Sequence, residues 1–342
     1  MKNTISLLPL LFVALLASSS EDRPAREKHF SAIRQLTFGG ENAEAYFDAS
    51  GGRLIYQSTR PPYECDQIFV RDLVTGADRL VSTGKGRTTC SYFFPDGKHI
   101  LYSSTHLGSE ACPPRPSYDR GYVWAIYRDY DIFTADLNGK DVHRLTDTPG
   151  YDAEATISAA ARRIVFTSVR DGDLELYSMK FDGGDVRRLT HEPGYDGGAF
   201  YSPDGKRIVY RASRPDSSEL EKYRVLLREA LVQPRQLEIW LMDADGSHKV
   251  QVTHNGAANF APYFHPSGRR IIFASNVNDP TGRNFDLFLV NLDGTGLEQI
   301  TFNETFDGFP MFSPDGKQLV FASNRNAKIR GETNIFLADW VE

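Results

Sequence analysis

Oxygen-bearing side chains recur at one position of the sequence, nine residues before a repeated turn. They are Asn42, Thr88, Asp152, Asp196, Asn259 and Asp307. Two residues further along each copy stand Glu44, Cys90, Glu154, Gly198, Ala261 and Phe309. Alternate residues of a strand share a face, so Glu44 and Glu154 add carboxylates on the same side. Converging carboxylates repel one another and need a cation, a basic ligand group or hydrogen-bond donors.

This pattern supports two kinds of chemistry. Oxygen ligands suit Ca²⁺, or the amine and hydroxyl groups of a ligand. The predicted ligand-binding residues are Asn42, Glu44, Asp152, Glu154, Asp196, Asn259 and Asp307. Alternatively, Asp152, Glu154 and Asp196 supply the acid and base of a carbohydrate-active lyase or hydrolase, because a carboxylate pair suffices for glycoside cleavage.

A structural role is the third interpretation of these residues. Asp and Asn near turns often accept hydrogen bonds from nearby backbone N–H groups. Because the oxygen-bearing position recurs in every copy, we favour this role for most of its members.

The turn that anchors these positions is part of a sixfold repeat. Residues 312–321 (FSPDGKQLVF) match residues 201–210 (YSPDGKRIVY), and four further copies have turn residues at equivalent positions. The six anchors are Gly51, Gly97, Ala161, Gly205, Gly268 and Gly316. Asp-Gly between apolar runs is a strong hairpin signal, because Gly adopts a positive φ without steric cost. Six units of about 45 residues, each with four antiparallel strands, predict an all-β, six-bladed β-propeller.

The ends of the chain suggest how the ring closes. The last unit ends at Trp340 after its third strand, whereas residues 33–38 (IRQLTF) carry the fourth-strand pattern. We therefore predict that this N-terminal strand completes the last blade, which removes an exposed sheet edge. Residues 33–342 then form one domain.

Two insertions, about 104–129 and 214–238, both fall between the second and third strands of a unit. They are therefore expected on one face, which we predict to be the binding face. In the second insertion Leu220, Tyr223, Leu227 and Leu231 have helical spacing, with Ser217 or Ser218 as the cap. This helix either packs on its own blade or lies over the channel mouth.

The first insertion is rich in aromatic residues: Tyr118, Tyr122, Trp124, Tyr127 and Tyr130. Such side chains either stack on a ligand or anchor the loop. Trp124 and Tyr127 join the predicted ligand-binding residues on the first interpretation. The three cysteines, Cys65, Cys90 and Cys112, are expected to lie near one another and to form one disulfide, which we expect to include Cys112 because its loop is long.

The amino-acid composition of the chain argues against some classes of partner. The 342 residues include 45 acidic and 39 basic side chains, so binding to nucleic acid through bulk charge is not expected. Lys2, an apolar run over residues 5–17 and three serines predict a cleaved signal peptide over residues 1–20. No lipoprotein cysteine follows, and no later run is long enough to span a membrane. We expect a monomer exported to the periplasm or secreted.

The Ser-Pro-Asp-Gly-Lys turns and Arg-Leu-Thr strands resemble those of the TolB-like propeller family over residues 33–342. The resemblance implies the fold, but the same repeat occurs in peptidase propellers and oligogalacturonate lyases. The α/β domain that precedes the propeller in TolB, the hydrolase domain and G-x-S-x-G motif of the peptidases, and the His-rich metal site of the lyases have no counterpart here. We therefore expect a binding or scaffold protein that engages a protein, peptide or glycan at the channel mouth, without a cofactor unless Ca²⁺ binds there.

Overall fold

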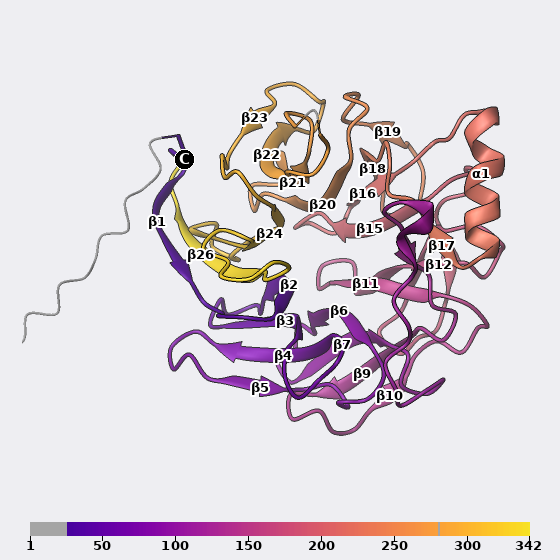
Figure 1. Cartoon of the computed structure of the whole chain (residues 1–342), viewed down its shortest axis with the longest axis horizontal. Coiled ribbons are helices and arrows are strands. Elements are labelled where there is room, and N and C mark those ends of the chain that lie inside the picture. The colour runs from indigo at the N-terminus through magenta and orange to yellow at the C-terminus, as the bar shows by residue number, and fades with distance from the viewer. Residues whose placement is uncertain (1–25, 280) are drawn as a thin grey trace, which may run out of the picture.

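The computed structural model describes residues 26–279 and 281–342, and the predicted signal peptide lies outside them. Figure 1 shows a disc of antiparallel sheets arranged radially around a centre. Six of these sheets have four strands each, so the chain forms a six-bladed β-propeller, as the repeat predicts.

The four strands of each blade follow one another outward from the centre. The innermost strands are β2 (Glu41–Phe47), β6 (Thr88–Phe93), β11 (Asp152–Ser158), β15 (Asp196–Tyr201), β20 (Asn259–Phe264) and β24 (Asp307–Phe312). The second strands are β3 (Arg53–Thr59), β7 (His99–Ser104), β12 (Arg163–Ser168), β16 (Arg207–Ala212), β21 (Arg270–Ser275) and β25 (Gln318–Ser323). The innermost strands contact one another around the whole ring, including β24 against β2.

The outer half of each blade is shorter. The third strands are β4 (Gln67–Asp72), β9 (Asp131–Asp136), β13 (Glu175–Met179), β18 (Glu238–Asp243), β22 (Asp286–Asn291) and β26 (Asn334–Trp340). The outermost strands of the first five blades are β5 (Asp78–Leu80), β10 (His143–Arg144), β14 (Arg187–Arg188), β19 (Val250–Gln251) and β23 (Glu298–Gln299).

The outermost strand of the sixth blade comes from the other end of the chain. Strand β1 (Phe30–Gln35) pairs antiparallel with β26, with Gln35 opposite Phe336 and Phe30 opposite Trp340. Strand β1 starts earlier than the predicted segment 33–38, because β26 extends to Trp340 and offers a partner to Phe30. Figure 1 shows the two strands side by side at the edge of the disc.

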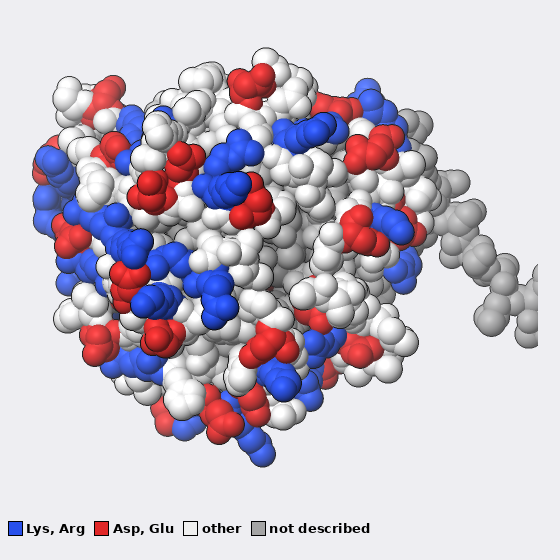
Figure 2. Space-filling model, turned by 180° about the vertical axis from the view of Figure 1, so that it is seen from behind, with Lys and Arg blue, Asp and Glu red and all other residues white. Residues whose placement is uncertain are grey.

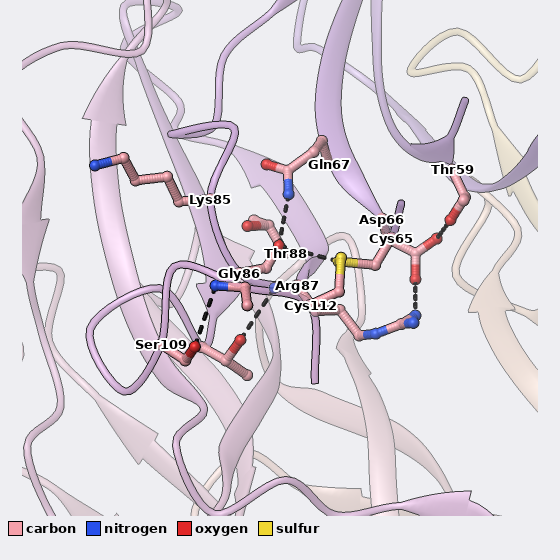
Figure 3. Close-up of a disulfide and its surroundings, with 12 residues drawn as sticks. Thr59, Cys65, Asp66, Gln67, Lys85, Gly86, Arg87, Thr88, Ser109 and Cys112 are labelled. Carbon is pink, nitrogen blue, oxygen red and sulfur yellow. Dashed lines mark hydrogen bonds and ion pairs between the residues drawn. A yellow bond between two sulfur atoms is a disulfide. The ribbon is translucent and has the colours of Figure 1, made fainter. Parts of the chain in front are cut away.

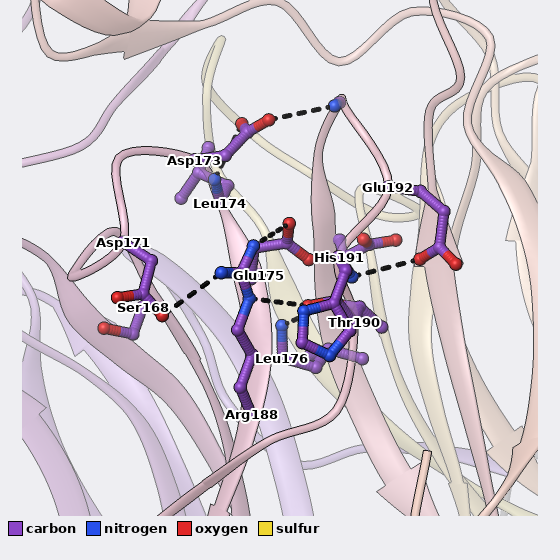
Figure 4. Close-up of polar contacts among 12 residues, drawn as sticks. Ser168, Asp171, Asp173, Leu174, Glu175, Leu176, Arg188, Thr190, His191 and Glu192 are labelled. Atoms are coloured by element: carbon purple, nitrogen blue, oxygen red, sulfur yellow. Dashed lines mark hydrogen bonds and ion pairs between the residues drawn. The ribbon is translucent and has the colours of Figure 1, made fainter. Parts of the chain in front are cut away.

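One hydroxyl repeats in all six blades and explains the Arg-Leu-Thr pattern. The second residue after each outermost strand is Ser or Thr, and its Oγ accepts a hydrogen bond of 2.8–2.9 Å from the backbone N–H of the second residue of the third strand. Figure 4 shows this bond between Leu176 and Thr190. In the sixth blade the hydroxyl belongs to Thr37, which accepts from Ile335. The N-terminal segment thus makes the same contact as the outermost segments of the other blades.

One buried acid at the start of a third strand, Glu175, is paired with an arginine of its own blade. In Figure 4 the Arg188 side chain donates to Glu175 at 2.9 Å and to Asp171 at 3.3 Å. Glu175 is 1 % exposed, so this guanidinium supplies the compensation that a buried carboxylate needs.

The two insertions carry the remaining elements. The first, between β7 and β9, holds η1 (Tyr118–Arg120) and β8 (Trp124–Ala125), and the second, between β16 and β18, holds α1 (Ser217–Arg228) and β17 (Leu231–Val232). The helix is shorter than predicted, and its cap is Asp216, whose carboxylate accepts from the N–H groups of Ser218 and Glu219. Leu231 lies in β17 rather than in the helix.

Candidate functional site

The acidic members of the first repeated position lie inside the blades rather than around an open channel entrance. Asp152, Asp196 and Asp307 are at most 1 % exposed. Each accepts a hydrogen bond from an arginine 18 residues further along the chain, at 2.7–3.0 Å. These partners are Arg170, Arg214 and Arg325. The arginines also lie over aromatic rings of the same blade, such as Phe166 and Phe321.

The uncharged members of this position are also engaged. Asn42 accepts from Ser58 at 2.8 Å and donates to the backbone carbonyl groups of Gly39 and Thr333. Asn259 donates to the carbonyl of Leu237 at 2.8 Å, and the Thr88 hydroxyl lies 3.0 Å from that of Ser104. The prediction that Asn42, Asp152, Asp196, Asn259 and Asp307 face a ligand is therefore not supported, because burial and internal partners occupy them.

Burial changes the ionisation of these carboxyl groups without exposing them. It raises the pKa of Asp152 and Asp307, and it raises that of Asp196 well above its usual value, although the facing arginines oppose the shift. The Oδ2 atom of Asp196 and the Oδ1 atom of Asp307 have no hydrogen-bond partner. The raised pKa values therefore reflect a structural position inside the sheet rather than an acid facing a substrate.

The second repeated position forms the wall of the hub. Its six members, which we call the hub ring, all line one central cavity: Glu44, Cys90, Glu154, Gly198, Ala261 and Phe309. All six have a positive φ, between 50° and 58°, and the pairing register shifts beside each of them. A β-bulge thus sets these side chains in every blade. The left-handed conformation costs an L-residue about 1–2 kcal/mol, so five non-glycine members hold strain at the hub.

A layer of mostly large side chains fills the hub beneath the ring. These residues stand five before each anchor: Tyr46, Tyr92, Thr156, Phe200, Tyr263 and Met311. The rings of Tyr46 and Phe200 are 5.6 Å apart, and those of Phe200 and Tyr263 are 5.2 Å apart. The cavity above this layer has a volume of about 40 Å³. About 10–15 Å³ of such volume holds one water molecule, so the hub accepts a single small polar group rather than a sugar ring.

Glu154 is held by four donors on its side of the hub. Arg211 donates to it at 2.8 Å, Tyr195 at 2.9 Å, Thr167 at 2.9 Å and the Gly198 N–H at 2.7 Å. Arg211, which is 8 % exposed, also donates to the Tyr195 hydroxyl at 2.7 Å. With its lone pairs used in this way, the Glu154 carboxylate has little capacity for further chemistry.

Gly197 makes room for this network. A Cβ atom at Gly197 would lie 2.2 Å from the Tyr195 hydroxyl and 2.4 Å from Glu154 Oε2, closer than real Cβ contacts come. The glycine is therefore required by close approach of the network rather than by its own φ.

Glu44 has a different environment, although it lies in the same ring. Among the described residues, no Lys, Arg or His forms an ion pair with it, and its hydrogen-bond partner is the Cys90 thiol. Burial raises the pKa of Glu44 to about 7; Arg211 opposes the shift and the Glu154 carboxylate adds to it. Glu44 is thus an acid at the hub whose charge lacks a direct counterion.

One disulfide forms among the three cysteines and includes Cys112, as expected. A disulfide joins Cys65 to Cys112 and ties the first insertion to the first blade (Figure 3). The backbone around it is bonded as well, since the Gly86 carbonyl accepts from the Gln67 side chain at 2.8 Å and the Gly86 N–H donates to the Glu110 carbonyl at 2.8 Å. Cys90 remains a thiol. Burial raises its pKa well above the usual value, so it is a poor nucleophile.

The two insertions join above the third blade into one element, which we call the canopy (residues 105–130 and 213–237). Strands β8 and β17 pair through Trp124 and Val232, and the Ile126 N–H donates to the Ala230 carbonyl at 2.8 Å. Tyr223 of α1 is buried and donates to Asp173 of the third blade. The helix thus packs on a neighbouring blade and on the other insertion rather than only on its own blade.

The predicted aromatic binding residues mainly anchor the canopy. The Tyr127 hydroxyl donates to the Pro114 carbonyl at 2.8 Å, and its ring lies 6.0 Å from that of Tyr130. The Trp124 ring packs edge-on against Tyr195 and lies 5.1 Å from the Arg211 guanidinium. Trp124 therefore connects the canopy with the hub network. Arg211 and Tyr195 were not predicted as site residues, because neither belongs to the repeated acidic positions.

The profile of the TolB beta propeller domain (PD40) matches residues 125–232 and 231–339, together more than half of the chain. The chain belongs to this TolB β-propeller family. No curated protein sequence matches it significantly.

Solved structures of this family and of others have the same fold. TolB from Acinetobacter baumannii is 21 % identical with a TM-score of 0.56, over 76 % of this chain and 54 % of that one. This chain thus spans about half the length of that TolB. A protein described as a TolB from Agrobacterium tumefaciens is 18 % identical with a TM-score of 0.57, over 91 % of this chain and 97 % of that one. The oligogalacturonate lyase of Vibrio parahaemolyticus is 13 % identical with a TM-score of 0.54, over 90 % and 93 %. At these identities the likeness concerns the fold.

Within residues 26–279 and 281–342, no group of three or more His, Cys, Asp and Glu side chains is placed to hold a metal ion. The helices of this part of the chain also include none long and apolar enough to cross a bilayer.

Proposed function

We propose that this protein is an exported binding or scaffold protein whose hub receives a cationic group of a partner peptide, on the face that carries the canopy. Glu44 is the residue that carries the proposal. It lies in a cavity of about 40 Å³ and has no ion pair with a described residue. An ammonium group there would supply the missing counterion, and charge-assisted hydrogen bonds are about twice as strong as neutral ones.

The surroundings of Glu44 favour a positive group over a negative one. Among the described residues, Arg211 supplies the one guanidinium that lines the cavity, and it already bonds Glu154 and Tyr195. The apolar members of the hub ring, Ala261 and Phe309, would contact the alkyl part of a lysine side chain. A lysine of the partner therefore fits better than a phosphate or carboxylate.

The enzyme alternative, with Asp152, Glu154 and Asp196 as acid and base, has less support. Asp152 and Asp196 are buried and bonded to Arg170 and Arg214, and Glu154 has four donors. General acid–base catalysis needs a carboxyl group within hydrogen-bond reach of the substrate. Asp152 and Asp196 have no such approach, and Glu154, although it lines the hub cavity, already accepts from four donors.

Export and a partner on the surface are parts of the same proposal. The predicted signal peptide and the Cys65–Cys112 disulfide favour an oxidising compartment such as the periplasm. Figure 2, the view from behind Figure 1, shows acidic and basic side chains interspersed, with basic ones densest toward the left. A surface with mixed signs favours local recognition over bulk attraction to a polyanion.

A peptide titration tests the hub. We expect an acetylated and amidated Gly-Lys-Gly peptide to bind the wild-type protein about tenfold or more tightly than the same peptide with norleucine in place of lysine, because only the ammonium group pairs with Glu44. Glu44→Gln should abolish this preference, since it keeps the shape and removes the charge. Chemical shifts in the protein or calorimetry measure both affinities.

Parallel arms with Ca²⁺ and with an uncharged oligosaccharide identify the other outcomes. Stabilisation of the protein by Ca²⁺ that Glu44→Gln removes would place a cation at the hub in place of a peptide. Tighter binding of the oligosaccharide than of the lysine peptide would favour the carbohydrate alternative. Equal affinity for the lysine and norleucine peptides would overturn the proposal.

A further inference from the structure

A large cavity lies between the canopy and the second and third blades. Its volume is about 920 Å³, and its wall includes Leu107, Ile126, Val169 and Leu227. It shares no lining residue with the hub cavity. Ligand sites in proteins typically measure about 300–1,000 Å³, so this cavity is large enough for an oligomeric ligand.

The cavity exists because the two insertions are joined. Besides the β8–β17 pairing, the Arg128 side chain of the first insertion donates to the Arg228 carbonyl of α1 at 3.1 Å. Arg120 forms a further ion pair with Glu229 at 2.9 Å. These contacts join the helix to the first insertion along one side of the cavity.

Basic side chains reach the cavity from three segments: Arg128, Arg144, Arg224 and Arg228. Arg144 forms an ion pair with Asp131 at 2.6 Å, and Arg228 forms one with Glu221 at 2.9 Å. Arg224 is exposed and makes no hydrogen bond or ion pair with another residue in the described part of the chain. Arg224 and Arg228 are four residues apart and share one face of the helix. Because Arg224 has no partner of its own among the described residues, it is available to an acidic group.

Acidic side chains on the same wall are available as well. Asp129 and Asp147 line the cavity and are exposed. Neither has a hydrogen bond or an ion pair to any residue within 26–279 and 281–342. The cavity wall therefore carries two aspartates and one arginine, Arg224, that have no partner among the described residues.

We propose that the canopy cavity binds a zwitterionic ligand of the peptide class, with its ammonium group at Asp129 and Asp147 and its carboxylate at Arg224. A neutral sugar fits less well, because no aromatic side chain of the described residues lines this cavity to stack on a sugar ring. A simple anion would leave the two aspartates unpaired, and a simple cation would leave Arg224 unpaired. This site is separate from the hub. It would bind the two termini of a peptide, whereas the hub would bind a lysine side chain.

Tetra-alanine with free termini is the probe, compared with its N-acetylated form, its C-amidated form and maltotetraose. Calorimetry on the full protein should show saturable binding of the free peptide and a loss of about tenfold on blocking either terminus. Arg224→Ala should weaken the free peptide about tenfold and leave the C-amidated form unchanged, since the carboxylate contact is already absent there. The double variant Asp129→Asn with Asp147→Asn should weaken the free peptide about tenfold. It should leave the N-acetylated form unchanged, since the ammonium contact is already absent there.

Two control variants separate this site from others. Arg269→Ala removes an exposed arginine of the fifth blade that lines neither cavity, and it should have no effect. Glu44→Gln removes any hub binding of the peptide's ammonium group, and saturable tetra-alanine binding should persist in this variant, so that the hub and canopy proposals can fail separately. Absence of saturable binding, equal affinity for the free peptide and either blocked form, tighter binding of maltotetraose, or loss of binding in Glu44→Gln would each overturn the proposal. Because the Arg224 side chain is exposed and has no hydrogen bond or ion pair to a described residue, its replacement tests binding without threatening the fold.

Discussion

Replacing Arg211 with Met is expected to lower the free energy of unfolding by about 3–5 kcal/mol. Arg211 is buried and bonds Glu154 and Tyr195 at 2.7–2.8 Å. Met fills a similar volume but leaves the Glu154 carboxylate without its cation in a low-dielectric site. Urea denaturation followed by fluorescence measures the loss.

A double-mutant cycle separates the charge effect from packing. Glu154→Gln alone should cost less than Arg211→Met, and the double variant should recover part of the loss, because no uncompensated carboxylate remains. Additive losses from the two replacements, or a cost of Arg211→Met below about 1 kcal/mol, would show that the hub pair does not carry the expected coupling.

Replacing Phe30 with Ala is expected to cost about 3–5 kcal/mol, since it removes a fully buried aromatic side chain. The Phe30 ring lies 5.8 Å from that of Phe321 and 6.0 Å from that of Trp340. These contacts attach β1 to the sixth blade. Loss of Phe30 should therefore also open the edge of β26 to solvent, which amide hydrogen exchange over residues 334–340 would detect.

Val74→Ala provides the control for this prediction. Val74 is 91 % exposed in the first blade, and its truncation should change stability by less than about 0.5 kcal/mol. If Phe30→Ala were as mild as Val74→Ala, or if exchange over β26 stayed slow, the N-terminal strand would not close the propeller.

The fold was predictable because its signals are local and repeated. Asp-Gly turns mark the hairpins, and each terminal Thr has a defined partner, as Thr190 has in Leu176. Even the role of Thr37 follows from its match to the outermost segments of the other blades. Such features can be recognised from neighbouring residues and from their sixfold repetition.

The site was less predictable, because its geometry depends on a β-bulge that the sequence does not mark. The bulge turns Glu44 and Glu154 toward the hub, whereas Asn42 and Asp152, two residues before them, lie inside the sheets. A simple alternation of strand faces places all four together. One signal was available: arginines stand 18 residues after the buried aspartates, as Arg170 does after Asp152.

The canopy had no usable sequence signal. Strands β8 and β17 have two residues each and lie more than 100 positions apart, so neither has a recognisable pattern. The cavity with Arg224 and Asp129 exists only because these two segments meet. Insertions on one face could be predicted, but their union could not.

Proton release on binding of the blocked Gly-Lys-Gly peptide tests the hub proposal most directly. The pKa of Glu44 is raised to about 7, so near pH 7 about half of the protein carries a protonated Glu44, and an ammonium group binds the ionised form. Calorimetry at pH 7 in two buffers of different ionisation enthalpy should give release of about half a proton per peptide, with affinity rising from about pH 6 to about pH 8. Glu44→Gln should release none. Binding without proton release in the wild type, or the same release in Glu44→Gln, would contradict a hub that receives a cationic group at Glu44.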